Sequence, residues 1–291
     1  MSVPSAPLTP HAPFAAAASL DFGTPGERAV VSLAGEPSAP LDFWVGCRHG
    51  PDAPWSLLPF FHAAPGGPAP LPKGRYGRFL GWAGDKWMIG PLVFKLCTPF
   101  EPRPEPADDR LRHAPVLCGY LEYDNTHGDD PVELVCGFGG ACEPLAVDGG
   151  AAFGLDGAFG FATAVTDGVE ARRDAAIFGA DLGPAAALHF SVPPRAKRVH
   201  PLALGFYRTG YHYSSQFAGL ADVLAHGLAH HARLLAVADA RDAEFMRSAL
   251  TLPARAEAAH AVRVWLARTV RRDGDPEVDL GGLRALCAAV K

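Results

Sequence analysis

Residues 124–130, with the sequence DNTHGDD, form a compact polar group between two apolar stretches. Their carboxylate, amide, hydroxyl and imidazole groups are those that calcium sites and acid–base catalysts use. The same composition suits a tight β-hairpin turn, because Asp and Asn bond to their own backbone and Asn and Gly accept a positive φ. The run lacks the alternating acidic spacing and the closing glutamate of a helix–loop–helix calcium site. We therefore predict a structural turn made by Asp124, Asn125, Thr126 and Gly128.

A second group with ligand chemistry consists of His226, His230 and His231. Two imidazoles four residues apart lie on one face of a helix, which is the spacing of zinc ligands in H-E-x-x-H. Here Gly227 replaces the glutamate that follows the first histidine, and the sequence shows no third ligand. We interpret these residues as surface or interface histidines and expect no metal site.

Paired carboxylates occur at Asp129 and Asp130 and again at Asp273, Asp275, Glu277 and Asp279. A glycosidase needs two carboxyl groups about 5 Å apart for retention, or farther apart for inversion, in a rigid cleft. A turn and a polar tail are poor places to hold such a pair, so no catalytic residue is assigned. The chain also lacks a G-x-S-x-G motif and a Walker A sequence, and we expect no cofactor.

Aromatic residues could bind a sugar, because their rings stack on the apolar faces of pyranoses. Most aromatic side chains of a β-sandwich fill its core, so about three in four should be buried. The candidates are Trp44, Trp55, Trp82, Trp87 and Tyr211, with Tyr76 as a further possibility.

These groups must be positioned by a mainly β fold. From residue 14 to about 213, short apolar runs alternate with Gly, Pro, Asp and Asn, as in sandwiches and barrels. We predict a large antiparallel β-sandwich, supersandwich-like, occupying a domain of residues 1–213. The expected strands are Ala15–Phe22, Ala29–Leu33, Leu41–Cys47, Trp55–Phe60, Lys86–Leu96, Val116–Tyr123, Val132–Phe138, Phe159–Ala164, Ala175–Phe178, Ala186–Val192 and Val199–Tyr207.

Near Ser214 the apolar period changes to that of an amphipathic helix. We predict a linker helix over residues 214–252, capped by Ser214 or Ser215, and a second helix over Ala254–Val270. The mainly β part is thus followed by about two α-helices and a polar tail.

Composition excludes several classes of protein. The net charge of −5 gives no electrostatic footprint for nucleic acid. No run approaches 18 apolar residues, which argues against a membrane span, and the proline-broken N-terminus is a poor secretory signal. The six cysteines form no CxxC pair and fit reduced core thiols. A cytoplasmic location is expected.

Several stretches, in order, resemble the N-terminal region of glycoside hydrolase family 52, the β-xylosidases. They are HAPFAAAASLDFG (11–23), LDFWVGC (41–47), WSLLPFF (55–61), WMIGPLVFKLCTPFEPRPEP (87–106), APVLCGYLEYDNTHG (114–128), ALHFSV (187–192), LALGFYRTGY (202–211) and AAHAVRVWLA (258–267). The resemblance implies a β-sandwich that is joined to an (α/α)6 barrel and acts in xylan degradation. Residues 253–291 would then be a remnant of the first barrel helix plus a polar tail.

The family's barrel carries a glutamate nucleophile and an aspartate acid/base. The nucleophile lies in an Asn-Glu-Gly-Glu-Tyr-like stretch soon after the first barrel helix. Here the corresponding stretch is DGDPEVDLGG (273–282), so Glu277 is not assigned that role. The resemblance therefore implies a truncated, split or repurposed glycosidase that is inactive alone.

Possible partners follow from the same resemblance. A sandwich without its barrel exposes a surface that would otherwise be covered, so a separate helical-barrel chain or a second copy could dock there. The alternative is a stand-alone module that binds xylo-oligosaccharide or another protein.

Overall fold

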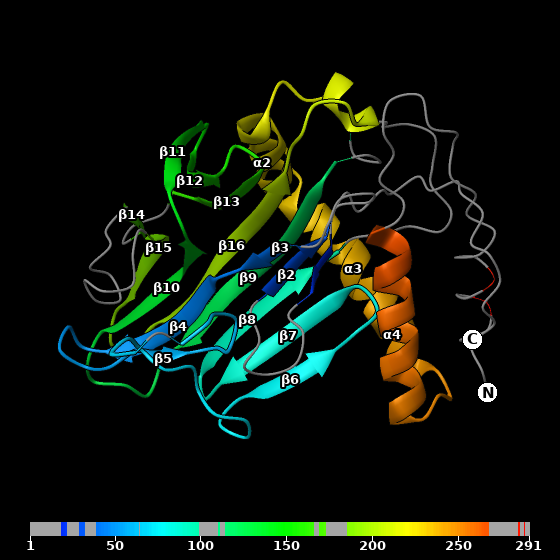
Figure 1. Ribbon diagram of the computed structural model, residues 1–291. Helices are drawn as coiled ribbons and strands as arrows, with labels where there is room; N and C mark the ends of the chain where they lie inside the picture. Colours follow the sequence, from blue (N-terminus) through cyan, green and yellow to red (C-terminus); the bar gives the residue numbers. More distant parts are fainter. Residues whose placement is uncertain are drawn as a thin grey trace.

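The structure is a computed structural model that describes residues 19–21, 29–32, 39–63, 65–98, 110, 114–165, 169–172, 185–267, 285 and 288. It is mainly β, with two large antiparallel sheets followed by α-helices, as predicted (Figure 1). In the described part of the chain, no helix combines the length and the apolar content that crossing a lipid bilayer requires.

The smaller of the two large sheets has five strands. Its order is β14 (Val169–Arg172), β15 (Ala185–Val192), β10 (Val132–Gly139), β4 (Phe43–His49) and β5 (Ser56–Leu57). Each neighbouring pair is antiparallel.

The larger sheet has eight strands, also antiparallel throughout. Its order is β11 (Cys142–Val147), β12 (Gly150–Leu155), β13 (Phe159–Ala164), β16 (Lys197–Phe206), β9 (Val116–Asp124), β8 (Leu92–Cys97), β7 (Gly84–Ile89) and β6 (Gly77–Leu80). A separate three-stranded sheet joins β1 (Ser19–Asp21), β2 (Ala29–Ser32) and β3 (Ala39–Leu41).

The main core lies between the two large sheets, because alternate residues of each strand point inward. On β10 the inward residues are Val132, Leu134, Cys136 and Phe138, all at most 1% exposed. Phe43 contacts four neighbouring aromatic rings at centroid distances of 5.2–6.3 Å. Each such ring contributes about 1.5–3 kcal/mol relative to an exposed one, so the sandwich is held mainly by this layer.

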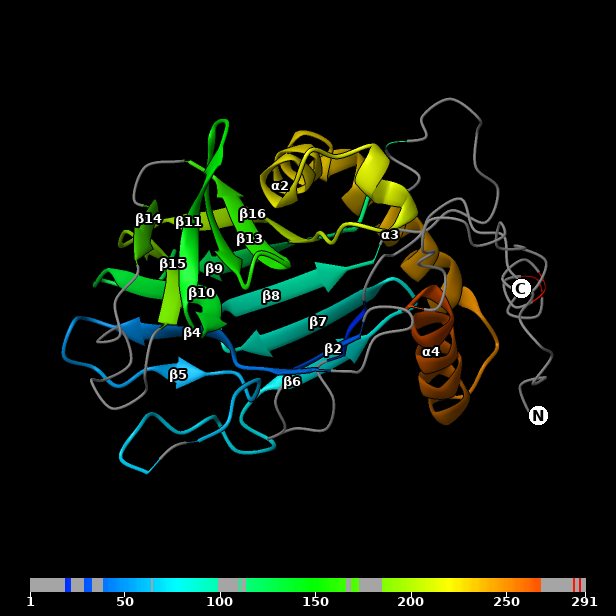
Figure 2. The ribbon, with the colours of Figure 1, turned by 45° about the horizontal axis from the view of Figure 1, so that its top comes forward.

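A second core lies between the outer face of the eight-stranded sheet and the helices (Figure 2). Small residues form one row across this face, since each is the cross-strand partner of the next. The row is Gly84, Cys97, Cys118, Ala203, Ala162 and Ala152. Small side chains allow a helix to approach the sheet closely.

Helix α2 (Leu220–Ala229) makes that close approach at Gly227. A Cβ atom at this position would lie 2.5 Å from Cγ2 of Val116 and 3.1 Å from Cβ of Ala203. The replacement of the H-E-x-x-H glutamate by glycine therefore has a packing reason.

The helical region differs from the prediction in one respect. The linker helix expected over residues 214–252 is a short 3₁₀ helix, η3 (His212–Ser215), followed by α2 and α3 (His231–Arg247). The division falls at His230, whose ψ of 10° departs from helical geometry. Both helices fold back onto the sandwich. The second predicted helix is α4 (Leu252–Ala267), with Pro253 in its first turn, where no intrahelical N–H donor is required.

Most predicted strands are present, but several boundaries were wrong. The run Lys86–Leu96 is a hairpin of β7 and β8, since Gly90 takes a positive φ of 54° between them. The run Leu41–Cys47 divides between β3 and β4, and Trp55–Phe60 contains only the two-residue β5. The strands β6, β11, β12 and β14 were missed, because their Gly-, Ala- and Pro-containing sequences have low β propensity. The run Ala175–Phe178 lies outside the described residues.

Candidate functional site

Residues 124–130 connect the two large sheets. The chain turns here, but the hairpin prediction was wrong, because β9 and β10 belong to different sheets. Asn125 is 4% exposed, and its Nδ2 group donates to Asp130 O and Pro193 O, both at 2.9 Å. Asp124 Oδ1 accepts from Thr126 N at 3.1 Å and Thr126 Oγ1 at 2.6 Å.

The neighbouring connection, residues 193–196, crosses between the sheets beside the first. Asn125 N donates to Ala196 O at 2.9 Å, Arg195 N donates to Gly128 O at 3.3 Å, and Arg195 pairs with Asp129. The hydrogen bond from Thr126 is the main reason why the pKa of Asp124 is held below its usual range. The polar groups of this turn are thus used to join two crossing connections.

The three histidines of the helical region do not converge on one point. His226 is 7% exposed, and its ring centroid lies 4.5 Å from that of His230. The Nε2 atom of His231 lies 2.5 Å from Gly119 O, so this ring attaches α3 to β9. Among the described residues, no group of three or more potential ligands could hold a metal ion. His226 is buried, so of the two positions expected from the sequence, surface or interface, the surface does not apply to it.

Four of the five proposed sugar-stacking residues are buried: Trp87 (0% exposed), Trp82 (1%), Tyr211 (3%) and Trp44 (4%). Trp82 stacks on Phe245 of α3 at a centroid distance of 5.2 Å. Arg78 covers Trp87, with Cζ 4.5 Å from the ring centroid, and the partly buried Tyr76 packs beside it. Trp55 is partly exposed and lies on the outer face of the five-stranded sheet.

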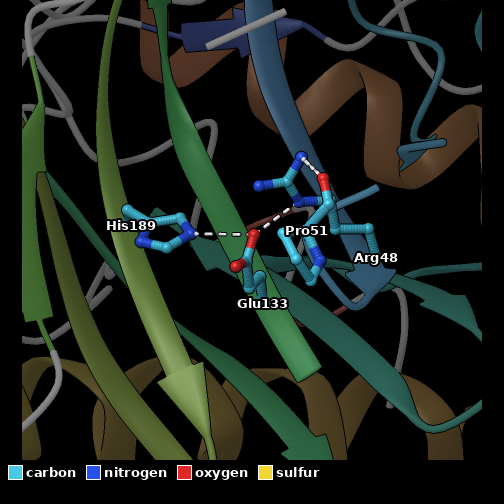
Figure 3. A network of polar contacts seen from close by, with 4 residues as sticks. All are labelled: Arg48, Pro51, Glu133 and His189. Atoms are coloured by element: carbon cyan, nitrogen blue, oxygen red, sulfur yellow. Dashed lines mark hydrogen bonds and ion pairs between the residues drawn. The ribbon is translucent and has the colours of Figure 1, made fainter. Parts of the chain in front are cut away.

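Three polar residues lie together on that face, one from each of three neighbouring strands, and two of them, Arg48 and His189, contact the Trp55 ring. They are Arg48 of β4, Glu133 of β10 and His189 of β15 (Figure 3). Arg48 and Glu133 are cross-strand partners, and alternation along the strands directs all three side chains away from the main core. We call Arg48, Trp55, Glu133 and His189 the outer-face cluster.

Glu133 is the centre of the outer-face cluster. Its Oε2 atom accepts a hydrogen bond from Arg48 Nε and lies 3.4 Å from His189 Nε2. Arg48 Nη1 donates to Pro51 O at 2.8 Å, and Arg48 Cζ lies 4.6 Å from the centroid of the Trp55 ring. Partial burial opposes ionisation of Glu133, but the hydrogen bond and charge of Arg48 outweigh it and hold its pKa below the usual range. An ionised Glu133 is an acceptor and not a general acid at neutral pH.

The sequence reasoning did not select Arg48, Glu133 or His189. Each is the polar residue at an outward position in an otherwise apolar strand, as Glu133 is in VELVCGFG. That pattern marks a half-buried face, but which strands are neighbours is decided only by the sheet.

Carboxylates that are buried in the described residues have structural roles. Asp85 is 2% exposed and accepts from Arg78 Nε at 3.0 Å and Nη2 at 2.7 Å. Asp242 is 8% exposed, and its Oδ1 accepts from Ala83 N at 2.8 Å and Gly84 N at 3.3 Å. The acidic tail at residues 273–279 lies outside the described residues.

The cysteine thiols are the remaining reactive groups of the described residues. The cysteines of the described residues are all buried and none forms a disulfide, as predicted. Burial raises the pKa of Cys47 and of Cys118 to about 12, so both remain protonated and unreactive at neutral pH.

Comparison with known proteins agrees with the resemblance seen in the sequence. The profile of glycosyl hydrolase family 52 matches residues 20–278. The chain is also 28% identical over 234 residues to a β-xylosidase of Geobacillus stearothermophilus, an alignment that covers 68% of this chain. The aligned region is 37% of that enzyme's length. Because the family match extends over most of the sequence, this chain belongs to glycoside hydrolase family 52.

Proposed function

We propose that this chain provides the β-sandwich part of a glycoside hydrolase acting on β-xylosides, and that it does not itself cleave the glycosidic bond. The observation that carries this proposal is the family match across the sandwich and the helices, combined with the structural use of the buried carboxylates. The substrate class is taken from the β-xylosidase relative.

Glycoside hydrolysis requires one carboxyl group that is protonated near neutral pH and a second that is ionised, facing each other across the substrate. In the described part of the chain, Asp85 is held by Arg78, and Asp242 is held by two backbone N–H groups. Glu133 has a lowered pKa, which is the wrong direction for an acid catalyst. All three carboxylates are thus engaged by donors of the chain itself.

The family resemblance adds a second argument. The segment of residues 273–282 departs from the stretch in which the family carries its nucleophile. We therefore propose that the catalytic carboxylates come from a helical barrel on a separate chain or on a segment beyond this sequence. A second copy of this chain is the alternative partner.

Hydrolysis of an aryl β-xyloside by the purified chain tests the proposal, with the Geobacillus β-xylosidase as the positive control. We expect no release of the aryl group above the buffer rate. Turnover by this chain, abolished by replacing a single Asp or Glu, would overturn it. Glu133→Gln and Asp85→Asn are the first variants to compare if turnover is found.

A further inference from the structure

We propose that the outer-face cluster is a binding site for a neutral oligosaccharide, with Trp55 as the stacking ring and Arg48, Glu133 and His189 as hydrogen-bonding partners of the hydroxyl groups. This binding role goes beyond the proposed function, and it requires no hydrolysis. Only the choice of a xylose-based probe rests on the proposed function.

The position of the cluster on its sheet is the first argument. Residues Trp44, Leu57, Phe61, Val135, Ala185 and Ala187 form a small apolar core on the same outer face, and Trp55 packs against it. The polar members are only partly buried, with side-chain exposures of 19% for Arg48, 22% for Glu133 and 12% for His189. Trp55, itself partly exposed, thus lies at the boundary between a buried apolar cluster and a polar group that water can reach. Sugar sites have this composition, because a pyranose presents apolar C–H faces and a polar edge of hydroxyls.

The hydrogen-bonding capacity of the cluster is the second argument. The Oε2 atom of Glu133 accepts from Arg48 and lies 3.4 Å from His189 Nε2, and no described residue donates to Oε1. Arg48 uses Nε for Glu133 and Nη1 for Pro51, and no described residue accepts from its Nη2 atom. A carboxylate oxygen and a guanidinium N–H held side by side match two adjacent hydroxyl groups, one donating and one accepting.

The charge of the cluster is the third argument. The positive charge of Arg48 and the negative charge of Glu133 are paired, so these two charges cancel. A paired cluster attracts neither an anion such as phosphate nor a cation, but it offers donors and acceptors to a neutral polyol. Because β4, β10 and β15 are neighbouring strands, the groups are also held in place before a ligand arrives.

Isothermal titration calorimetry of the full chain with xylotriose, cellotriose and maltotriose, each up to about 10 mM, tests the proposal. We expect saturable binding of at least one sugar. Trp55→Ala should weaken it more than about tenfold, and Glu133→Gln should also weaken it. Trp55→Phe retains a ring and should retain part of the affinity. Phe79→Ala, which removes an aromatic residue that is 37% exposed on the other large sheet, is the matched control and should leave binding unchanged.

Absence of binding by the unmodified chain for all three sugars would overturn the proposal, whatever the stability of the variants. Binding that survives Trp55→Ala in a folded variant would also overturn it, since the sugar would then occupy another surface. Competition by inorganic phosphate would show an anion site instead. Binding of cellotriose or maltotriose without xylotriose would support the site while counting against the β-xyloside assignment.

Discussion

Asp242 provides the sharpest test of how the helices are attached to the sandwich. Its carboxylate reaches from α3 to the turn between β6 and β7, where Oδ1 accepts from Ala83 N and Gly84 N. The turn is shaped to receive it, because a Cβ atom at Gly81 or Gly84 would lie only 2.4 or 2.6 Å from the carboxylate oxygens. The side chain is 8% exposed, so water does not readily replace it.

The expected effect of Asp242→Ala follows from these contacts. A hydrogen bond to a charged group contributes about 1.5–3 kcal/mol, and the donors left behind in a buried turn lose their partner. Of the two bonds, the one from Gly84 is long at 3.3 Å. We expect the free energy of unfolding to fall by about 2–4 kcal/mol. At about 2–4 °C per kcal/mol, the thermal midpoint should fall by roughly 4–16 °C.

Asp239→Ala is the matched control, one turn earlier on the same helix and with the same change of charge. The Asp239 side chain is 51% exposed and pairs with Lys95, and such surface pairs contribute about 0–1 kcal/mol. Urea unfolding of both variants followed by circular dichroism compares the two carboxylates directly. Equal losses of stability, or a loss below about 1 kcal/mol for Asp242→Ala, would refute the reasoning.

Two further predictions concern the sandwich itself. Asn125→Asp replaces a buried amide donor by an acceptor that faces Asp130 O, so it should lower the free energy of unfolding by about 3 kcal/mol. The control Asp124→Asn, at an exposed position, should lower it by less than about 1 kcal/mol. Similar urea midpoints for the two variants would contradict this prediction. Burial and the charge of Arg198 lower the pKa of His200 to about 4, so the stability it contributes is present above about pH 6.5 and is lost as the pH falls towards 4. In His200→Leu, the free energy of unfolding should therefore decline less between pH 7 and pH 4.5 than it does in the wild type. His127→Leu, at an exposed position, should leave the decline unchanged. The same pH dependence of the free energy of unfolding in the wild type and in His200→Leu would contradict the prediction.

The sequence determined the class of fold and much of its local structure. Alternating apolar residues, as in VELVCGFG of β10, select a strand with a buried face, and Asp124, Asn125 and Gly128 select a turn. The change to a helical period of apolar residues near Ser214 predicted the helices that follow the sandwich. These features depend on residues close together in the chain, so local physical chemistry is sufficient to predict them.

Long-range pairing was not available from the sequence. Whether the turn at 124–130 closes a hairpin or crosses between sheets depends on the strands with which β9 and β10 pair. The neighbours of β9 are β8 and β16, whereas those of β10 are β4 and β15. The division of the helical segment at His230 likewise depends on the surface that α2 and α3 pack against. The hydrophobic effect requires that the apolar face of each strand or helix be buried, but the same pattern of apolar residues can be buried against many different partners.

The candidate site also depended partly on the sequence and partly on the tertiary structure. The sequence selected Trp55 by its chemistry, together with Trp44, Trp82, Trp87 and Tyr211, and could not distinguish the partly exposed ring from the buried ones. Arg48, Glu133 and His189 are separated by 85 and 56 residues along the chain, and only the order of β4, β10 and β15 places them beside that ring. The tertiary structure decided the site, because the cross-strand register fixes which side chains from distant segments share one face of the sheet.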